Sequence, residues 1–265
     1  MSAKNNQTEA EPNLRHFLQE NISVMFGVDR RIFPTLNHLL FSPGKLTREY
    51  ISGETQAFTP PTTLYFTINL LFFLLLPIVN SGGVKLFSFS YENFVNNNEG
   101  PIAEMIIADM NSTGLPEAVY IAQFDSFIRY NQPALIFIII PFLIGILSLL
   151  NIRQRSRLLS HTVYAFHFMS FYLVTFLLFG ALANGILPLI RFMPKEDFLL
   201  VILPSIPLLL YALWTYYYLF KSISVVYAGP IWISLVKAIF LLVSLVGLLF
   251  LYTRLLLTLS IMSVN

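Results

Sequence analysis

Residues 60–80 read PPTTLYFTINLLFFLLLPIVN and contain no charged side chain. A helix needs roughly 20 predominantly apolar residues to cross the hydrocarbon core of a bilayer, and this run has that length. Pro60 and Pro61 open the run, where a helix tolerates proline because its first turn has no backbone acceptor for the missing N–H group. Residues 60–80 therefore predict a membrane-spanning helix.

The composition of the whole chain agrees with a membrane location. Of the 265 residues, 56% are hydrophobic and 11% are charged, whereas a soluble domain carries about 25% charged residues. The 16 basic and 14 acidic side chains leave a net charge of +2 and form no long basic run. Nucleic acids are bound through clustered basic residues, so the sequence predicts an integral membrane protein without a nucleic-acid partner.

Four more segments are comparably long and apolar, and polar connections separate them. They are 132–150, 158–180, 198–219 and 231–253. Together with 60–80 they predict an all-α fold, a polytopic transmembrane helix bundle of about five spans. The chain then divides into a cytoplasmic juxtamembrane segment, 1–59, and a transmembrane domain, 60–265.

Lysine and arginine residues are distributed unevenly between the connections. Ten lie before the first span, in the second connection and in the fourth, whereas four lie in the first and third connections. Because positively charged connections are retained in the cytoplasm, this distribution predicts a cytoplasmic amino terminus and an exterior carboxyl terminus.

The juxtamembrane segment carries apolar residues at helical spacing. The spacing recurs in 13–26 and in 32–40, and each stretch predicts a short amphipathic helix. Ser42 and Pro43 predict the cap and the first residue of another helix, which Gly53 ends in a left-handed conformation. We expect these helices to form a collar on the cytoplasmic leaflet or, alternatively, a docking surface for a partner protein.

The connection between the first two spans, residues 81–131, is too long to be a simple link. Residues 84–91 alternate in polarity and predict a strand, while 102–110 and 116–130 have the spacing of amphipathic helices. The connection holds six acidic and two basic side chains. We therefore expect an acidic exterior insertion that is mainly α with a minor β component.

Several kinds of chemistry have no matching residues. The chain has no cysteine, which excludes disulfides, thiolate nucleophiles and cysteine-bound metal clusters. Every acidic residue except Glu196 and Asp197 lies at or before Asp125, so no carboxylate lies within an expected span. Intramembrane aspartyl proteases and proton-coupled transporters usually need such carboxylates. No metal site and no cofactor is predicted, and whether the protein is an enzyme stays open.

Three polar side chains at membrane depth form the candidate intramembrane site: His167, Asn69 and His161. His167 lies about ten residues inside the third span, near the bilayer midplane at ~1.5 Å per residue. A neutral imidazole there needs a hydrogen-bond partner, and Asn69, halfway along the first span, has a matching depth. The offset of His161 from His167 prevents both from binding one metal ion on a straight helix. Pairing between packed helices and a functional site both remain open.

A second candidate site is a group of basic side chains at the cytoplasmic ends of the spans. Its members are Arg48, Lys45, Arg153, Arg155 and Arg157. Retention of positive charge in the cytoplasm is enough to explain them. The alternative is a pocket for an anionic lipid head group or a phosphate, formed where the collar meets the second connection.

Several short motifs resemble one family. The first block comprises Ser42-Pro43-Gly44, Arg48-Glu49-Tyr50, Gly53, Pro60-Pro61, Leu64-Tyr65 and Asn69-Leu70-Leu71-Phe72-Phe73. Two further blocks surround the histidines 161 and 167 and the tyrosines 216–218 and 227. They resemble a bacterial integral membrane family of unknown function, and the resemblance implies a multi-pass protein of the bacterial inner membrane. An amino-terminal zinc ribbon, often attached in such families, is absent from this cysteine-free chain.

The expected activity has three alternatives. The first is a binding or transport-type helical bundle for a lipid or small amphiphile, with His167 and Asn69 beside kinked helices. The second is a membrane enzyme that acts on an anionic lipid head group, with His161 as acid or base and Arg48 and Arg153 holding phosphate. The third is a structural or assembly protein that binds a partner through the collar. Membrane lipids are expected partners in each case, and the oligomeric state stays open.

Overall fold

The computed structural model describes residues 31–81, 85, 87–95, 100–152, 158–190 and 205–264. For 186–190 and for residue 205 it describes the backbone alone. Within these ranges every regular element is a helix, so the all-α prediction is confirmed.

The described helices follow one another in a simple order. They are α2 (Ile32–Phe41), α3 (Lys45–Ile51), α4 (Pro61–Asn80), α5 (Tyr91–Val95), α6 (Pro101–Thr113), α7 (Glu117–Leu135), η1 (Ile136–Ile138), α8 (Ile139–Leu150), α9 (Leu158–Ile190), α11 (Ser205–Tyr227) and α12 (Ile231–Val264). The short 3-10 turn η1 joins α7 directly to α8, so these three elements form one continuous segment.

Among the residues that the structure describes, four helical segments are long and apolar enough to cross a membrane. They are Pro61–Asn80, Glu117–Leu150, Leu158–Gly185 and Ile231–Val264. Their outer faces expose large apolar side chains, such as Leu74 on α4, Phe142 on α8 and Val243 on α12. Extended apolar surface of this kind is stable in contact with lipid rather than with water. The protein is therefore a membrane protein built as a helical bundle.

α11 is a fifth long helix that is not among these four segments. The expected span at 198–219 begins in residues that the structure does not describe, and α11 continues to Tyr227. The second half of α11 carries hydroxyl-bearing side chains and Lys221, which lower its hydropathy. The tyrosines at 216–218, expected at the cytoplasmic end of a span, therefore lie in the middle of this helix.

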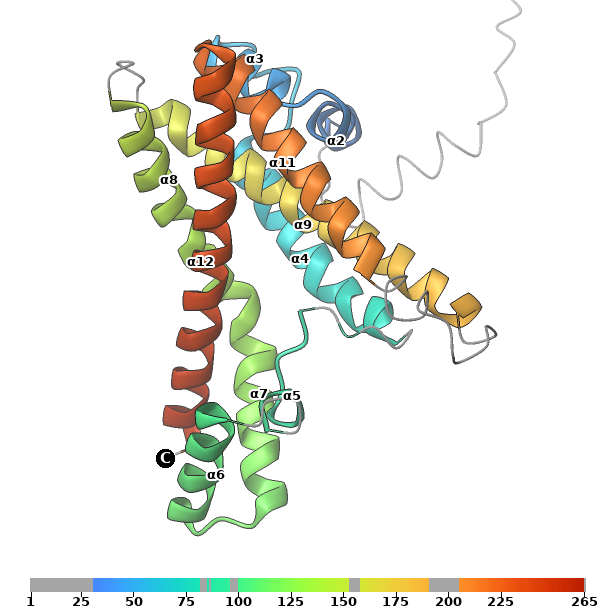
Figure 1. Cartoon of the computed structure of the whole chain (residues 1–265), viewed down its shortest axis with the longest axis vertical. Coiled ribbons are helices and arrows are strands. Elements are labelled where there is room, and N and C mark those ends of the chain that lie inside the picture. Colours follow the sequence, from blue (N-terminus) through green and yellow to red (C-terminus); the bar gives the residue numbers. More distant parts are fainter. Residues whose placement is uncertain are drawn as a thin grey trace, which may run out of the picture.

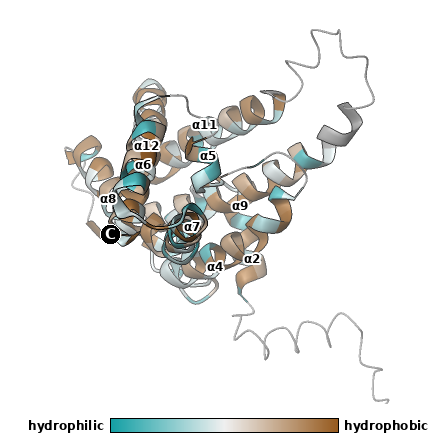
Figure 2. Ribbon diagram, turned by 90° about the horizontal axis from the view of Figure 1, so that it is seen from below, coloured by the Kyte–Doolittle hydropathy of each residue, from teal (hydrophilic) through white to brown (hydrophobic). Residues whose placement is uncertain are grey.

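α9 occupies the centre of the bundle, where it contacts α4, α8, α11 and α3 (Figure 1). α12 runs alongside α11, α8 and α7. The helices α2 and α3 lie at one end of the molecule, here called the collar end, and α5 and α6 lie at the opposite, insertion end (Figure 1). Figure 2 shows that hydrophobic residues dominate α4, α8 and α9, whereas α5 and part of α7 are hydrophilic.

Two segments are longer than their apolar patterns predicted. The exterior helix predicted at 116–130 and the span predicted at 132–150 form one continuous segment, because α7 accommodates Pro133. The helix α12 extends to Val264 instead of ending near residue 253. At ~1.5 Å per residue each segment is about 50 Å long, which exceeds the ~30 Å of a hydrocarbon core. Both therefore project at the insertion end, where α6 packs against α12.

The strand predicted at 84–91 is wrong in the part that the structure describes. Residues 87–90 have no regular structure, and α5 begins directly after them. A strand needs a neighbouring strand for its backbone groups, and the described ranges contain none. Instead, the rings of Phe87 and Phe89 pack against Tyr252 on α12, with centroids 5.9 Å and 6.0 Å from that ring. The alternating pattern thus reflects an aromatic contact with the bundle.

The collar differs from its prediction in where α3 begins. Ser42 and Pro43 lie in a turn, and α3 starts directly after Gly44, whose φ of +79° is left-handed. Gly53 follows the helix with a φ of +105°, so its predicted left-handed conformation is confirmed. The amphipathic helix predicted at 13–26 lies outside the described residues.

Candidate functional site

His167 is buried in the contact between α9 and the collar helix α3. Its side chain is 1% exposed, and its Nδ1 atom lies 2.9 Å from the hydroxyl oxygen of Thr47. The ring of Tyr50, also on α3, meets the imidazole edge-on with 6.1 Å between centroids. The second ring nitrogen, Nε2, is buried without a hydrogen-bond partner among the described residues. His167 therefore lies in a packed seam that attaches α3 to the bundle.

A close backbone contact between Gly44 and α11 positions the start of α3. A Cβ atom at residue 44 would lie 2.7 Å from the Cα atom of Ser222 and 2.8 Å from its carbonyl oxygen. Side chains do not approach backbone atoms so closely, so glycine alone fits this site. Ser222 also shares a hydrogen bond of 2.6 Å with the hydroxyl group of Tyr164 on α9. The helices α3, α9 and α11 thus meet at one tight junction.

Asn69 lies in a different seam from His167. Its amide nitrogen donates to the hydroxyl oxygen of Tyr65 at 3.2 Å and to the carbonyl oxygen of Pro133 on α7 at 3.2 Å. The predicted hydrogen bond between Asn69 and His167 is therefore wrong. The two residues were matched by depth in the bilayer, but depth does not determine which face of a helix carries a residue.

His161 belongs to a polar cluster at the collar end. Its Nδ1 atom lies 2.8 Å from the hydroxyl oxygen of Tyr227, and the two rings stack with centroids 5.6 Å apart. The ammonium group of Lys237 lies 5.9 Å from the centroid of the same tyrosine and donates to the side-chain oxygen of Asn151 at 2.6 Å. Asn151 and Tyr227 mark the carboxyl-terminal ends of α8 and α11, where helix dipoles favour a positive charge. The cluster therefore joins the ends of four helices.

Removal of the ammonium group at Lys237 should weaken this helix junction. We expect Lys237→Met to lower the free energy of unfolding by ~1–3 kcal/mol, because Asn151 loses a hydrogen bond from a charged donor. Lys221→Met is the matched control, since Lys221 is exposed on α11 and its loss should change stability by less than about 0.5 kcal/mol. Equilibrium unfolding in detergent micelles measures both. Equal stability of the two variants would contradict a structural role for Lys237.

The structure describes two members of the predicted basic site, Lys45 and Arg48. The Nζ atom of Lys45 lies 3.6 Å from the carboxylate of Glu49 on the same helix. Arg48 is exposed, and its guanidinium group makes no hydrogen bond or ion pair with any described residue. The three other members, Arg153, Arg155 and Arg157, lie outside the described residues. No described contact brings an arginine to His161, as the enzyme hypothesis would require.

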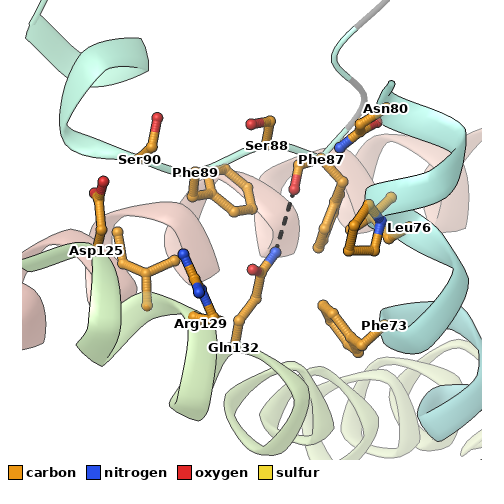
Figure 3. Close-up of a pocket in the computed structure, with 12 residues that line it drawn as sticks. Phe73, Leu76, Asn80, Phe87, Ser88, Phe89, Ser90, Asp125, Arg129 and Gln132 are labelled. Atoms are coloured by element: carbon orange, nitrogen blue, oxygen red, sulfur yellow. Dashed lines mark hydrogen bonds between the residues drawn. The ribbon is translucent and has the colours of Figure 1, made fainter. Parts of the chain in front are cut away.

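A pocket of about 260 Å³ lies at the insertion end, between α4, residues 87–90 and α7 (Figure 3). Its apolar lining consists of Phe73, Leu76, Pro77, Phe87, Phe89 and Ile128. Its polar lining consists of Asn80, Ser88, Ser90, Asp125, Arg129 and Gln132. Figure 3 shows Phe73 and Leu76 on one side of the pocket, with Asp125 and Arg129 on the other. The pocket is therefore amphipathic.

Two hydrogen bonds hold residues 87–90 against α7 beside the pocket. The side-chain nitrogen of Gln132 donates to the carbonyl oxygen of Phe87 at 3.3 Å, as Figure 3 shows. The Oδ1 atom of Asp125 accepts the backbone N–H of Tyr91 at 2.7 Å. Arg129 is exposed, and its guanidinium group makes no hydrogen bond or ion pair within the described ranges. These two hydrogen bonds thus hold residues 87–90 in place as a wall of the pocket. The guanidinium group of Arg129 remains available to a ligand.

Tyr91 begins α5 beside the pocket and attaches this short helix to its neighbours. Its hydroxyl group donates to the sulfur atom of Met110 on α6 at 3.5 Å, and its ring meets that of Phe124 on α7 at 6.1 Å. Burial, followed by the negative charge of Glu117, raises the pKa of Tyr91. The hydroxyl group therefore stays a neutral donor at physiological pH.

The candidate intramembrane side chains make contacts between helices. Among the residues that the structure describes, no group of three or more histidine, aspartate or glutamate side chains could hold a metal ion. The two candidate histidines make interhelical contacts through their Nδ1 atoms.

The pocket was not predicted, although Asp125, Arg129 and Gln132 have the i, i+4, i+7 spacing of one helix face. That spacing is the signal from which it could have been found.

Residues 29–73 match the model of a family described as protein of unknown function (DUF3667). The predicted resemblance to a family of unknown function is therefore confirmed over this part of the chain. The match covers α2, α3 and the first part of α4, which together hold the contacts of Gly44, Thr47 and Tyr50 with the bundle. No curated protein and no solved structure matches the chain.

Proposed function

We propose that this membrane protein binds a lipid or small amphiphile in the pocket at its insertion end, in order to hold or transport it. The observation that carries the proposal is that the pocket places the apolar Phe73 and Leu76 opposite the charged Asp125 and Arg129, as Figure 3 shows. The apolar side comes from the last turns of α4, whose outer face exposes Leu74 and Ile78. An amphiphile can therefore place its polar group against α7 while its apolar part follows α4.

The size of the pocket favours partial enclosure of the ligand. Its volume is about 260 Å³, whereas pockets that enclose a whole drug-sized molecule measure ~300–1,000 Å³. A lipid head group and the first part of its chains fit this space. The rest of the chains would then lie along the exposed leucines of α4, in contact with the bilayer.

The charge distribution supports a location and an orientation as part of the same proposal. In the sequence, ten basic side chains lie before the first expected span and in the second and fourth connections, against four in the first and third connections; this distribution favours a cytoplasmic amino-terminal side. The pocket would then face the periplasmic leaflet of a bacterial inner membrane. The exposed Lys45 and Arg48 would lie at the cytoplasmic leaflet, where they can contact anionic lipids or a partner protein.

Photocrosslinking tests the proposed binding site. A phospholipid with a photoreactive acyl chain is incorporated with the full-length protein into vesicles, and the labelled peptides are identified by mass spectrometry. We expect labels on α4 near Phe73 and on residues 87–90. Phe73→Trp should reduce these labels at least ~10-fold, because the larger ring fills space that the ligand needs.

Phe142→Trp provides the matched control, because Phe142 is exposed on the outer face of α8. This variant makes the same chemical change outside the pocket and should leave the labels near Phe73 unchanged. Labels distributed evenly over all exposed apolar helix faces, and insensitive to Phe73→Trp, would show ordinary contact with bulk lipid and would rule out the proposed site.

A further inference from the structure

We infer that the pocket selects a phospholipid whose head group carries both a phosphate and a primary amine, an inference that rests on the proposed function. Its basis is a pair of opposite charges in the pocket that do not neutralise each other. Asp125 and Arg129 are one helical turn apart on α7, a spacing at which aspartate and arginine usually pair. Here Asp125 is bonded to the backbone of Tyr91, and Arg129 has no ion-pair partner among the described residues.

Arg129 is the charged hydrogen-bond donor of the pocket, and its chemistry suits a phosphate group. The planar guanidinium of Arg129 can donate two parallel hydrogen bonds to phosphate oxygens. The hydroxyl oxygens of Ser88 and Ser90 accept hydrogen bonds from Asn93, at 2.8 Å and 3.3 Å respectively. Figure 3 shows both hydroxyls on the opposite side of residues 87–90 from Arg129, so the guanidinium group of Arg129 makes the expected contact with the phosphate.

The carboxylate of Asp125 matches the amine. Its Oδ1 atom accepts the Tyr91 N–H at 2.7 Å, whereas Oδ2 has no partner in the described ranges. A carboxylate oxygen accepts N–H bonds from a primary ammonium group, and a quaternary ammonium group has no such proton to donate. A purely anionic head group would bring a second negative charge towards Asp125, which costs binding energy. The geometry therefore favours a phosphoethanolamine head group over phosphocholine or phosphoglycerol.

Titration with short-chain lipids tests this inference. The full-length protein in detergent is titrated calorimetrically with dihexanoyl phosphoethanolamine, phosphocholine and phosphoglycerol lipids and with uncharged dihexanoylglycerol. We expect the phosphoethanolamine lipid to bind at least ~10-fold more tightly than the other three, since each charge-assisted hydrogen bond contributes on this scale. Free phosphoethanolamine should bind ~10-fold more weakly than its lipid, because it lacks the apolar contacts.

Two variants assign the selectivity to the charged pair. Asp125→Asn keeps an oxygen that can accept the Tyr91 N–H but removes the negative charge, so it should abolish the preference for the amine. Arg129→Gln should weaken binding of all three phospholipids by ~10–100-fold and leave dihexanoylglycerol unchanged. Thermal unfolding of each variant confirms that the fold is intact.

The outcomes separate the two proposals. If no lipid binds, the proposed function fails. If all four lipids bind with equal affinity, or if both variants keep the wild-type preference, the proposed function stands and the head-group inference is overturned. Binding of free phosphoethanolamine as tightly as its lipid would overturn the proposed function together with the inference, because the ligand would then be a soluble molecule and not a lipid.

Discussion

Gly44→Ala is expected to lower the free energy of unfolding by ~2–4 kcal/mol, the largest loss that we expect from alanine at any of the glycines with a described Cβ environment. Part of the loss is conformational, since an alanine at a φ of +79° costs about 1–2 kcal/mol relative to glycine. The rest arises from overlap with Ser222, whose Cα atom would lie 2.7 Å from the new Cβ atom. Because this neighbour is backbone, no rotamer change can relieve the contact.

Gly114→Ala separates the two contributions. Gly114 has a similar φ of +66°, but no atom lies within 4 Å of its hypothetical Cβ position. Its substitution should therefore cost only the conformational term, about 1–2 kcal/mol. Equilibrium unfolding in the same detergent compares the two variants. Equal losses at both positions would mean that the contact between Gly44 and α11 is looser than the structure indicates.

The behaviour of Gly44 illustrates what the sequence could predict and what it could not. The left-handed backbone conformation of Gly53, at the other end of α3, can be predicted because a helix ends there, and a helix end is a local property of the chain. Gly44 stood in the motif Ser42-Pro43-Gly44 without a structural reason. Glycine is needed at position 44 because the backbone of Ser222 lies against it. Ser222 is 178 positions further along the chain, so the local sequence around Gly44 cannot predict this contact.

The membrane-crossing segments, like the conformation of Gly53, could be predicted because they depend on local sequence. Whether a helix can cross a bilayer depends on the composition of about 20 consecutive residues, so 60–80 could be read directly as a span. The ends of the helices were less predictable, because projection beyond the membrane depends on tertiary contacts. The carboxyl-terminal half of α12 continues as a helix where Tyr252 packs on Phe87 and donates to the carbonyl oxygen of Gln132.

The candidate sites depended on contacts between distant segments, and there sequence reasoning was less successful. Depth in the bilayer favours Asn69 as the partner of His167, whereas the structure gives Thr47 on α3. The pocket combines side chains from α4, from residues 87–90 and from α7. Its charged residues, Asp125 and Arg129, belong to the exterior connection in the sequence. A position on the surface explains their charge as well as a position in a pocket does.

His167→Ala is the second substitution for which we expect a large effect, a loss of ~2–4 kcal/mol in the free energy of unfolding. The change leaves a cavity at a side chain that is 1% exposed and removes the partner of the Thr47 hydroxyl group. Thr47→Val preserves shape while removing the same hydrogen bond, and should cost ~1–3 kcal/mol because the imidazole nitrogen is left unpaired. Thr258→Val is the control, since that exposed hydroxyl bonds only to its own helix.

A double-mutant cycle tests whether His167 and Thr47 act as a pair. If they do, the combined variant should lose about 1 kcal/mol less than the sum of the single losses.

Photolabelling of the insertion-end pocket, measured per folded molecule, should be the same in His167→Ala as in the wild type, because the histidine attaches the collar and does not line the pocket. A His167→Ala protein of normal stability that no longer labels near Phe73 would reverse this assignment. The histidine would then belong to a functional site, and the packed seam would not be its main role.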